Sequence, residues 1–186
     1  ATLLDLHQAL WWFHMVTALS WISLLGLTKL NHLIYAPVNA FLRSTDAPGK
    51  IPMIQNIEEQ EHFGVSQIEH FTAKQLFELD VCVRCGRCTD ECPADIAGQP
   101  LSPMHIIQDL KRHATDVGER KVANLARGLP IDDGLESAPA LVGDVIRDES
   151  LWACRTCGAC QTACPVFIEH VPTIVDMRRS LVMEEA

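Results

Sequence analysis

The first part of the chain is apolar, and most of the remainder mixes apolar with charged positions. Residues 9–28 form 20 consecutive positions without a formal charge, which corresponds to a helix of about 30 Å at roughly 1.5 Å per residue. That length matches the hydrocarbon core of a bilayer, and Trp11 and Trp12 lie near one end, where indole rings favour the headgroup region. The pattern predicts a membrane-spanning helix, with a buried helix of a large soluble protein as the alternative.

The charged residues suggest an orientation for this helix. All 15 Lys and Arg residues lie from Lys29 onward, and positively charged segments tend to stay in the cytoplasm. The C-terminal part is therefore expected on the cytoplasmic side of a cell inner or plasma membrane. A cleaved signal peptide is disfavoured because no basic region precedes the apolar stretch and His14 interrupts it. Since the chain starts at Ala1, almost inside this stretch, we expect an internal portion of a longer polypeptide.

Downstream of the apolar stretch, the periodicity predicts helices and no strands. Thr72 is a candidate N-cap, and Ser102 followed by Pro103 is typical of a helix start. Pro37 is expected to end or kink the first helix, because proline lacks a backbone N–H. The fold class is therefore mainly α, with further helices expected over residues 72–80, 103–115, 141–152 and 172–183.

The composition argues against a nucleic-acid partner. The formal net charge is −9 and aromatic residues make up only 6% of the chain. Phosphate backbones are bound by clustered Lys and Arg, and bases stack on aromatic side chains. We therefore expect no nucleic acid among the partners.

All eight cysteines fall into an internal repeat with an offset of 72 residues. Each copy reads C-x₂-C-x₂-C-x₃-C-P, over residues 82–93 and 154–165. This is the spacing of bacterial ferredoxins with two [4Fe–4S] clusters, in which the fourth cysteine of each motif ligates the other cluster. One cluster is therefore expected on Cys82, Cys85, Cys88 and Cys164, and the other on Cys154, Cys157, Cys160 and Cys92.

Disulfides and zinc are the competing uses of these cysteines. Positions three apart are poorly placed to bridge one another, and the cytoplasm is reducing. Zinc ribbons use separate C-x₂-C pairs rather than an overlapping triplet. Because 61 residues of helical character separate Cys92 from Cys154, we expect an α-helical ferredoxin module rather than the βαββαβ kind.

The glycines and prolines inside the two motifs have expected roles as well. Gly86 and Gly158 are expected to let the backbone approach a cluster closely. Pro93 and Pro165 are expected to turn the chain out of each motif and open the next helix.

Two histidines in the apolar part are candidate haem ligands. His14 and His32 are 18 residues apart, which is five turns of a helix, so on one continuous helix they share a face at an axial separation of about 27 Å. Neutral imidazole is a usual axial ligand of haem iron, and an ionisable group in a spanning helix indicates function. We expect each histidine to bind one haem b, with the opposing ligands on helices not present in this chain. The alternative is that His14 forms a hydrogen bond inside a bundle and His32 lies at the interface.

Longer stretches of the sequence resemble known families. The module from Cys82 to Val182 resembles the helical two-cluster domain of heterodisulfide-reductase-like proteins, also found in the membrane-anchoring subunit of anaerobic glycerol-3-phosphate dehydrogenase. Four stretches make the resemblance more specific. Because of them, essentially the whole chain resembles the bacterial membrane-bound electron-transfer-flavoprotein:menaquinone oxidoreductases. These stretches cover residues 29–39, 63–65, 164–170 and 175–179.

The resemblance implies a nitrate-reductase-γ-like cytochrome b domain before the clusters and cysteine-rich CCG domains after them. It implies that reduced electron-transferring flavoprotein delivers electrons to the two clusters, and that the haems at His32 and His14 lead to menaquinone. The domains would be a transmembrane helix of a cytochrome b-like domain (1–36), an interfacial linker (37–71) and an α-helical two-cluster ferredoxin domain (72–186).

Two other functions stay open at this point. A heterodisulfide-reductase-like or sulfite-reduction-linked membrane subunit would use the same relay, and a haem-free anchor and wiring subunit would lack the haems. The sequence contains no nucleophile–base constellation, so this segment is expected to relay electrons within a larger quinone-linked oxidoreductase rather than to catalyse turnover alone. The remaining downstream histidines are expected to be surface or structural residues: His62, His70, His105, His113 and His170.

Overall fold

The computed structural model describes residues 2–25, 28–54, 56–59, 62–135 and 138–183 of the 186-residue chain. Within these ranges the chain is mainly helical, as predicted, and its β pairing is limited to an isolated bridge between Val142 and Ile146. The α-helices are α1 (Leu3–Leu24), α2 (His32–Leu42), α3 (Ala73–Val81), α4 (Arg87–Asp90), α5 (Pro93–Ile96), α6 (Pro103–Arg127), α7 (Asp148–Ala153), α8 (Ala159–Ala163) and α9 (His170–Met183). The short 3₁₀ helices are η2 (Lys29–Asn31), η3 (Ile57–Glu59) and η4 (Ile68–His70).

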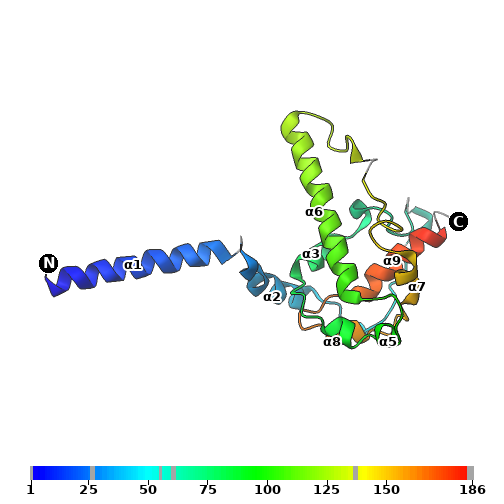
Figure 1. The fold of residues 1–186 in the computed structure, drawn as a ribbon, viewed down its shortest axis with the longest axis horizontal. Helices are drawn as coiled ribbons and strands as arrows, with labels where there is room; N and C mark the ends of the chain where they lie inside the picture. Colours follow the sequence, from blue (N-terminus) through cyan, green and yellow to red (C-terminus); the bar gives the residue numbers. More distant parts are fainter. Residues whose placement is uncertain (1, 26–27, 55, 60–61, 136–137, 184–186) are drawn as a thin grey trace.

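Helix α1 extends away from the rest of the molecule (Figure 1). It begins with a capping box, in which the Thr2 side chain accepts a hydrogen bond from the Asp5 amide and the Asp5 carboxylate accepts one from the Thr2 amide. None of its residues is buried, and its exposed side chains include Trp11, Trp12 and Trp21. The helix therefore exposes large apolar side chains to its surroundings.

The membrane-spanning helix predicted over residues 9–28 is not confirmed. Among the residues that the structure describes, no helix is both long enough and apolar enough to cross a bilayer. Helix α1 has 22 residues, but His7, Gln8 and His14 lower its mean hydropathy. Residues 26–27 of the predicted stretch lie outside the described residues.

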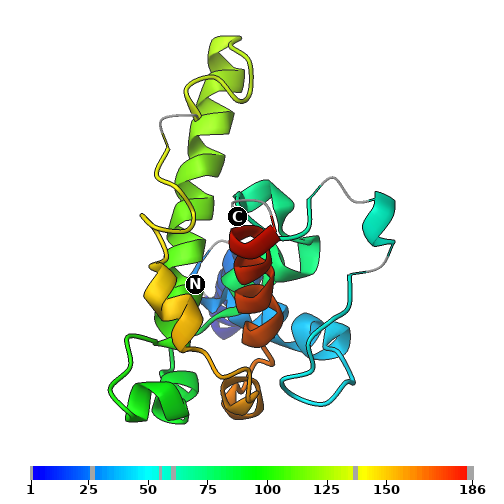
Figure 2. The same cartoon turned by 90° about the vertical axis from the view of Figure 1, so that its right-hand side faces the viewer.

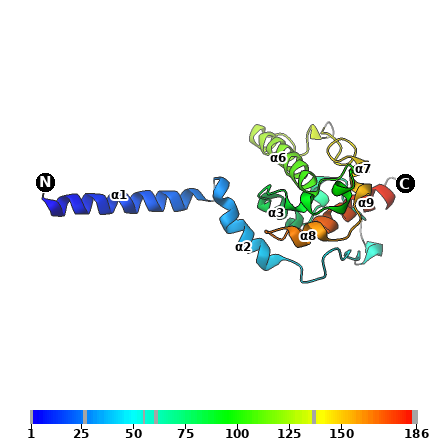
Figure 3. The same ribbon diagram turned by 60° about the horizontal axis from the view of Figure 1, so that its bottom comes forward.

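The prediction that His14 and His32 share one face of a continuous helix is wrong. Thr28 is extended, with φ −113° and ψ 178°, and its side chain accepts a hydrogen bond from Leu30 as the N-cap of η2. Helix α2 then starts at His32 and runs at an angle to α1 (Figure 3). Because a helical register cannot be counted through an extended residue, the shared face and the axial spacing of about 27 Å do not apply.

Pro37 was expected to end or kink its helix. Helix α2 continues past it to Leu42, so this proline does not end the helix. Pro37 removes one backbone hydrogen bond, but α2 packs against the body of the molecule. Tyr35 and Ala36 contact the core, and the Tyr35 ring lies 5.4 Å from the Phe77 ring of α3. This packing compensates for the missing hydrogen bond and attaches α2 to α3.

The helices predicted from their N-caps are confirmed. The Thr72 side chain caps α3, and the Ser102 side chain caps α6, whose first residue is Pro103. Helix α6 has 25 residues and ends at Arg127, followed by Gly128 as its C-cap at φ 72°, so it runs well beyond the end predicted near Thr115. Its second half contains no proline and many strong helix formers, and it rises above the packed body (Figure 2).

The helix predicted over residues 141–152 forms only in its last part. Helix α7 covers Asp148–Ala153, whereas the preceding chain turns back on itself. Gly143 adopts φ 101° and its amide donates to the Ile146 carbonyl at 2.8 Å. Leu141 and Ile146 are buried in the core. The left-handed glycine interrupts the helix, while the apolar residues that suggested a helix pack inward from a turn. The helix predicted over 172–183 is confirmed as α9.

The segment before α3 packs very closely on α9. The Val65 amide donates to the Asp176 carbonyl at 2.9 Å, and the Ser180 hydroxyl donates to the Val65 carbonyl at 3.0 Å. A Cβ atom on Gly64 would lie 2.1 Å from the Ser180 backbone nitrogen. Only glycine therefore fits at position 64 without moving α9.

Candidate metal centre

The two cysteine motifs adopt the same backbone conformation. Arg84 and Thr156 occupy equivalent positions and have φ 55° and 53°, while Gly86 and Gly158 have φ 84° and 76°. Each glycine precedes a short helix, α4 or α8, that carries the third cysteine of its motif. Positive φ is uncommon for residues with a Cβ atom. Its recurrence at matching positions shows that the sequence repeat is also a structural repeat.

The structure groups the eight cysteines into two sets of four, and each set lines its own cavity. The first cavity is lined by Cys82, Cys85, Cys88 and Cys164. The second cavity is lined by Cys154, Cys157, Cys160 and Cys92. Each cavity therefore combines three cysteines of one motif with the fourth cysteine of the other, which is the grouping that the crossed assignment requires.

The thiols are free, and their surroundings disfavour negative charge. All eight cysteines lack a disulfide, and the third and fourth of each motif are buried. Burial, assisted by the neighbouring thiols of each cavity, raises the pKa of Cys88 to about 11 and that of Cys160 to about 12. Thiolates gathered in these cavities would repel one another unless a positively charged group lay between them.

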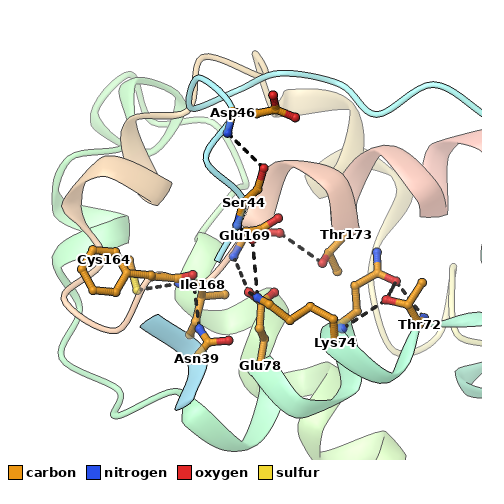
Figure 4. Close-up of polar contacts among 12 residues, drawn as sticks. Asn39, Ser44, Asp46, Thr72, Lys74, Glu78, Cys164, Ile168, Glu169 and Thr173 are labelled. Atoms are coloured by element: carbon orange, nitrogen blue, oxygen red, sulfur yellow. Dashed lines mark hydrogen bonds and ion pairs between the residues drawn. The ribbon is translucent and has the colours of Figure 1, made fainter. Parts of the chain in front are cut away.

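Backbone amides point at two of the sulfur atoms. The Thr156 amide donates to Cys154 Sγ at 3.4 Å. The Ile168 amide donates to Cys164 Sγ at 3.4 Å, as Figure 4 shows. Such N–H groups stabilise negative charge on sulfur. Each cavity therefore contains one cysteine whose sulfur accepts a backbone hydrogen bond.

Arg178 holds the start of the second motif, a role that no sequence pattern indicated. Its guanidinium donates to the Leu151 carbonyl and, at 2.6 Å, to the Cys154 carbonyl. It also lies 5.1 Å from the centre of the Trp152 ring. One residue of α9 thereby fixes the end of α7 and the first cysteine of the second motif.

The chain leaves the two motifs differently. Pro93 is the first residue of α5, as predicted, whereas no helix begins at Pro165. After the second motif the chain turns at Phe167, which adopts φ 59°. Asn39 of α2 is fully buried, and its Nδ2 donates to the Val166 carbonyl at 2.8 Å and to the Phe167 carbonyl at 3.3 Å. Helix α2 is thus bonded directly to the loop that follows Cys164.

A polar network beside this loop connects three segments (Figure 4). We call residues 43–54 the strap. The Ser44 amide of the strap donates to the Glu169 carboxylate at 2.8 Å, and the Glu169 amide donates to Glu78 Oε1 at 3.2 Å. Lys74 forms ion pairs with both carboxylates. Glu78 is 1% exposed, and burial raises its pKa despite the opposing influence of Lys74.

The strap also covers the second motif. A Cβ atom on Gly158 would lie 2.5 Å from the Pro48 carbonyl carbon and 2.6 Å from the Gly49 nitrogen. At Gly86, the equivalent position, the nearest atom would be the Asp90 carboxylate at 3.9 Å. The close approach at Gly158 is therefore made by the strap.

The histidines occupy different surroundings from those expected. His14 is exposed on α1, and His32 is the partly buried first residue of α2, so the structure places them on separate helices. His170, which was expected to be a surface or structural residue, is not at the surface: it is 2% exposed and lines the first cavity. Its ring Nδ1 is buried without a hydrogen-bond partner among the described residues. A buried histidine directly after the second motif could not be distinguished from a surface one by sequence pattern.

The donor set of the two cavities fits a pair of iron–sulfur clusters. A [4Fe–4S] cluster takes four cysteine thiolates, and each cavity offers four cysteines with N–H···S bonds nearby. Within the described part of the chain, no group of three or more His, Cys, Asp or Glu side chains is arranged to hold a single metal ion. The residues that would hold the clusters are the eight cysteines that line the two cavities.

Comparison with protein families finds a 4Fe-4S dicluster domain over residues 78–168, which includes both motifs. The chain is 42% identical over 189 residues to an EtfAB:quinone oxidoreductase of Syntrophomonas wolfei subsp. wolfei, a match that covers 95% of this chain and 26% of that protein. A probable membrane-anchored ferredoxin of Chromohalobacter salexigens is 41% identical over 128 residues, covering 66% of this chain and 19% of that protein. One component of a dihydromethanophenazine:CoB--CoM heterodisulfide reductase of Methanosarcina barkeri is 34% identical over 119 residues, covering 61% of this chain and 26% of that component.

No solved structure matches the chain. The chain spans only about a quarter of the length of the first of these relatives. The similarity to an EtfAB:quinone oxidoreductase and to a heterodisulfide reductase component confirms both resemblances drawn from the sequence. The chain therefore contains a 4Fe-4S dicluster domain and is similar to segments of iron–sulfur oxidoreductases.

Proposed function

We propose that this chain is the electron-transferring segment of a membrane-bound oxidoreductase that takes electrons from reduced electron-transferring flavoprotein and passes them to menaquinone. When bound, two [4Fe–4S] clusters supply one-electron carriers. Their ligands would be Cys82, Cys85, Cys88 and Cys164 for the first cavity and Cys154, Cys157, Cys160 and Cys92 for the second. The crossed grouping of the cysteines around two cavities is the observation on which the proposal rests.

The protein's own residues would hold the two cavities at a fixed spacing and keep water out of them. Cys88, Cys92, Cys160 and Cys164 are buried, while the apolar side chains of Ile168, Val171 and Ile174 line the cavity walls. Cys85 and Cys157 are exposed, so each cavity has one edge near the surface. Buried electron carriers with one exposed edge are suited to receive electrons from one protein and pass them to another.

The quinone link is supported by the similarity to a relative named as an EtfAB:quinone oxidoreductase. The domains of the proposal are those expected from the sequence: a transmembrane helix of a cytochrome b-like domain in 1–36, an interfacial linker in 37–71 and the ferredoxin domain in 72–186. The cytochrome b helices and CCG domains would come from the rest of the protein or complex. The cluster domain would lie on the cytoplasmic side of the cell membrane.

Helix α1 carries the membrane and haem parts of the proposal. Its residues are all outside the core and many are large and apolar, which suits packing against lipid or other apolar helices. A relative is named as a probable membrane-anchored ferredoxin. His14 and His32 would each ligate a haem b, but from two helices rather than one. His32 would serve the haem nearer the clusters, because α2 is bonded through Asn39 to the Cys164 loop.

A second candidate is a heterodisulfide-reductase-like or sulfite-reduction-linked membrane subunit. The similarity to a component of a heterodisulfide reductase favours it. The same cysteines would bind the clusters, but the electron donor and the electron acceptor would differ. A third candidate, a haem-free anchor and wiring subunit, uses the same clusters without His14 and His32.

The test is electron transfer through the full-length protein, purified anaerobically in detergent. We expect about eight iron atoms for this segment, since each [4Fe–4S] cluster holds four. We also expect b-type haem bands in the optical spectrum, and reduction of the clusters by reduced electron-transferring flavoprotein but not by buffer alone. Added menaquinone analogue should then reoxidise them. Reduction by a dithiol instead of the flavoprotein would favour the second candidate, and absence of haem bands would favour the third. Iron-free protein would overturn all three.

A further inference from the structure

Helix α2 turns an entirely apolar face away from the protein. Its inward side chains include Tyr35 and Ala36, which contact the core, and Asn39, which is buried. A surface helix in water normally shows the opposite pattern, with its polar residues outward. The exposed side chains of α2, which we call its outer face, are all apolar: Leu33, Ile34, Pro37, Val38, Phe41 and Leu42.

The outer face is exposed to an extent that calls for an occupant. Phe41 is 88% exposed, although burial of an aromatic ring is among the most favourable contributions that a side chain can make. The spacing of Ile34, Val38 and Phe41 places them on one side of the helix. A contiguous exposed apolar surface of this kind marks a site of contact with a membrane or with another protein.

The sizes of the side chains distinguish lipid from a neighbouring membrane helix as the occupant. Helices that pack on one another in a membrane use small residues, which let their backbones approach closely. The alanines of α2, Ala36 and Ala40, are only partly exposed and lie among its inward positions. The outer face has no Gly, Ala or Ser and carries Leu, Ile, Val and Phe instead. This distribution favours flexible lipid chains over a second helix.

The charges around α2 fit the surface of a bilayer. Between Asp5 and Asp46 the only formally charged residues are Lys29 and Arg43, although the chain contains 24 acidic residues. Lys29 lies three positions before α2 starts, and Arg43 directly follows its last residue. Basic residues beside an apolar helix face are attracted to anionic lipid headgroups, and they are typical of helices that lie in the membrane interface.

We propose that α2 lies along the surface of a phospholipid bilayer, with its outer face among the lipid chains, and so holds the cluster domain against the membrane. The inference rests on the membrane-bound part of the proposed function. Interfacial helices bury their apolar face about 5–10 Å into the boundary between headgroups and acyl chains. Helix α2 runs at an angle to α1 (Figure 3), so it can lie in the interface while α1 enters the membrane.

The opposite side of α2 transmits this contact to the cluster domain. Asn39 Nδ2 donates to the Val166 carbonyl at 2.8 Å, and Val166 lines the first cavity. The Tyr35 ring packs on the Phe77 ring of α3 with 5.4 Å between their centres. Because α2 is attached to the body at both of these places, its depth in the bilayer would set the orientation of the whole domain.

The test is photo-crosslinking of the full-length protein in nanodiscs of phosphatidylcholine and phosphatidylglycerol. The photoreactive residue p-benzoylphenylalanine takes the place of Phe41, and mass spectrometry should then find lipid adducts at this position. The matched control carries the same residue in place of Val122, an apolar side chain of α6 that is 67% exposed. This part of α6 rises above the packed body (Figure 2), so the control should form no lipid adduct.

A second measurement tests the depth of α2. The additional fluorescence of Phe41→Trp, compared with the unmodified protein, should be quenched more by lipids brominated near the headgroup than by lipids brominated near the chain end. The additional fluorescence of Val122→Trp should be quenched by neither lipid.

Three results would overturn the inference: crosslinks from position 41 to protein instead of lipid, equal lipid adducts at positions 41 and 122, or no lipid adduct at position 41. If the variant at position 41 loses its iron, the same photoreactive residue in place of Val38 decides instead. The measurements need no flavoprotein, quinone or haem. Electron transfer assayed in the same nanodiscs reports on the proposed function separately, so either can fail while the other holds.

Discussion

Alanine substitution at the two equivalent motif glycines separates the cost of backbone strain from the cost of displacing the strap. Gly86 and Gly158 occupy the same position of the repeat and have φ 84° and 76°. An alanine forced into this left-handed conformation costs about 1–2 kcal/mol. Both Gly86→Ala and Gly158→Ala should lose this amount of local stability.

Only Gly158 is crowded as well. Its added Cβ would lie 2.5 Å from the Pro48 carbonyl carbon and 2.6 Å from the Gly49 nitrogen, and these backbone atoms cannot rotate away. The strap must shift, which strains the hydrogen bond of 2.7 Å from the Gly49 amide to Gln161 Oε1. Overpacking of this kind costs about 1–3 kcal/mol. Gly158→Ala should therefore lose about 2–5 kcal/mol of local stability in total.

Hydrogen exchange followed by peptide mass spectrometry measures these local stabilities in the anaerobic full-length protein. The extra loss of about 1–3 kcal/mol corresponds to exchange about 5-fold to 150-fold faster around residues 156–164 in Gly158→Ala than around residues 84–92 in Gly86→Ala. Peptides of the strap should exchange faster in Gly158→Ala and stay unchanged in Gly86→Ala. Equal effects of the two substitutions, with the strap unaffected in both, would refute the packing of the strap on the second motif.

Three other substitutions test the remaining contacts. Cys92→Ser should alter the electron paramagnetic resonance signal of the cluster bound by the second motif; a change confined to the other signal would contradict the crossed grouping. Asn39→Leu removes two hydrogen bonds, to the buried carbonyl of Val166 and the partly buried carbonyl of Phe167, and should speed hydrogen exchange in α2 by the equivalent of about 2–4 kcal/mol; unchanged protection of α2 would show that the Asn39 side chain does not stabilise this helix. Gly64→Ala places a Cβ atom 2.1 Å from the Ser180 nitrogen and should cost about 3 kcal/mol of stability in α9, seen as a lower melting temperature; an unaltered melting temperature would contradict the packing.

The parts of the fold that were predicted from the sequence are set by short-range chemistry. The capping residues Thr72 and Ser102 start helices because their side chains bond amides three residues later. The two cysteine motifs carry enough local information to give matching positive φ angles at Arg84 and Thr156. The pairing of the motifs around two cavities could be expected because the ferredoxin spacing leaves each fourth cysteine to the other cluster.

The wrong helix predictions relied on local sequence patterns. At each of these places a backbone conformation or a packing contact that the pattern does not show decides the structure. Hydropathy remains high up to Leu25 and gave no sign that Thr28 would be extended and separate α1 from α2. Pro37 was expected to end or kink its helix, but α2, which packs on α3, continues past it. Over residues 141–147, apolar spacing suggested a helix where Gly143 produces a turn.

The site residues that sequence reasoning missed all act across long separations. Asn39 bonds residues more than 120 positions away, and Arg178 bonds the end of α7 from α9. The burial of His170 depends on how α9 packs against the first motif. No periodic pattern records such contacts, because each involves a single polar side chain among many that lie at the surface.

The same grouping that builds the cavities makes the two halves of the repeat interdependent. The first cavity is incomplete without Cys164, and the second is incomplete without Cys92. These fourth cysteines are buried in the main core with residues of α6 and α9, so each half contributes both a wall and a ligand to the other. The third cysteines, Cys88 and Cys160, belong to a smaller cluster with Val171 and Val175 of α9, which connects the two motifs directly. A cluster bound at either cavity would therefore stabilise both motifs, because closing one cavity would fix the loop of the fourth cysteine and with it the end of the other motif.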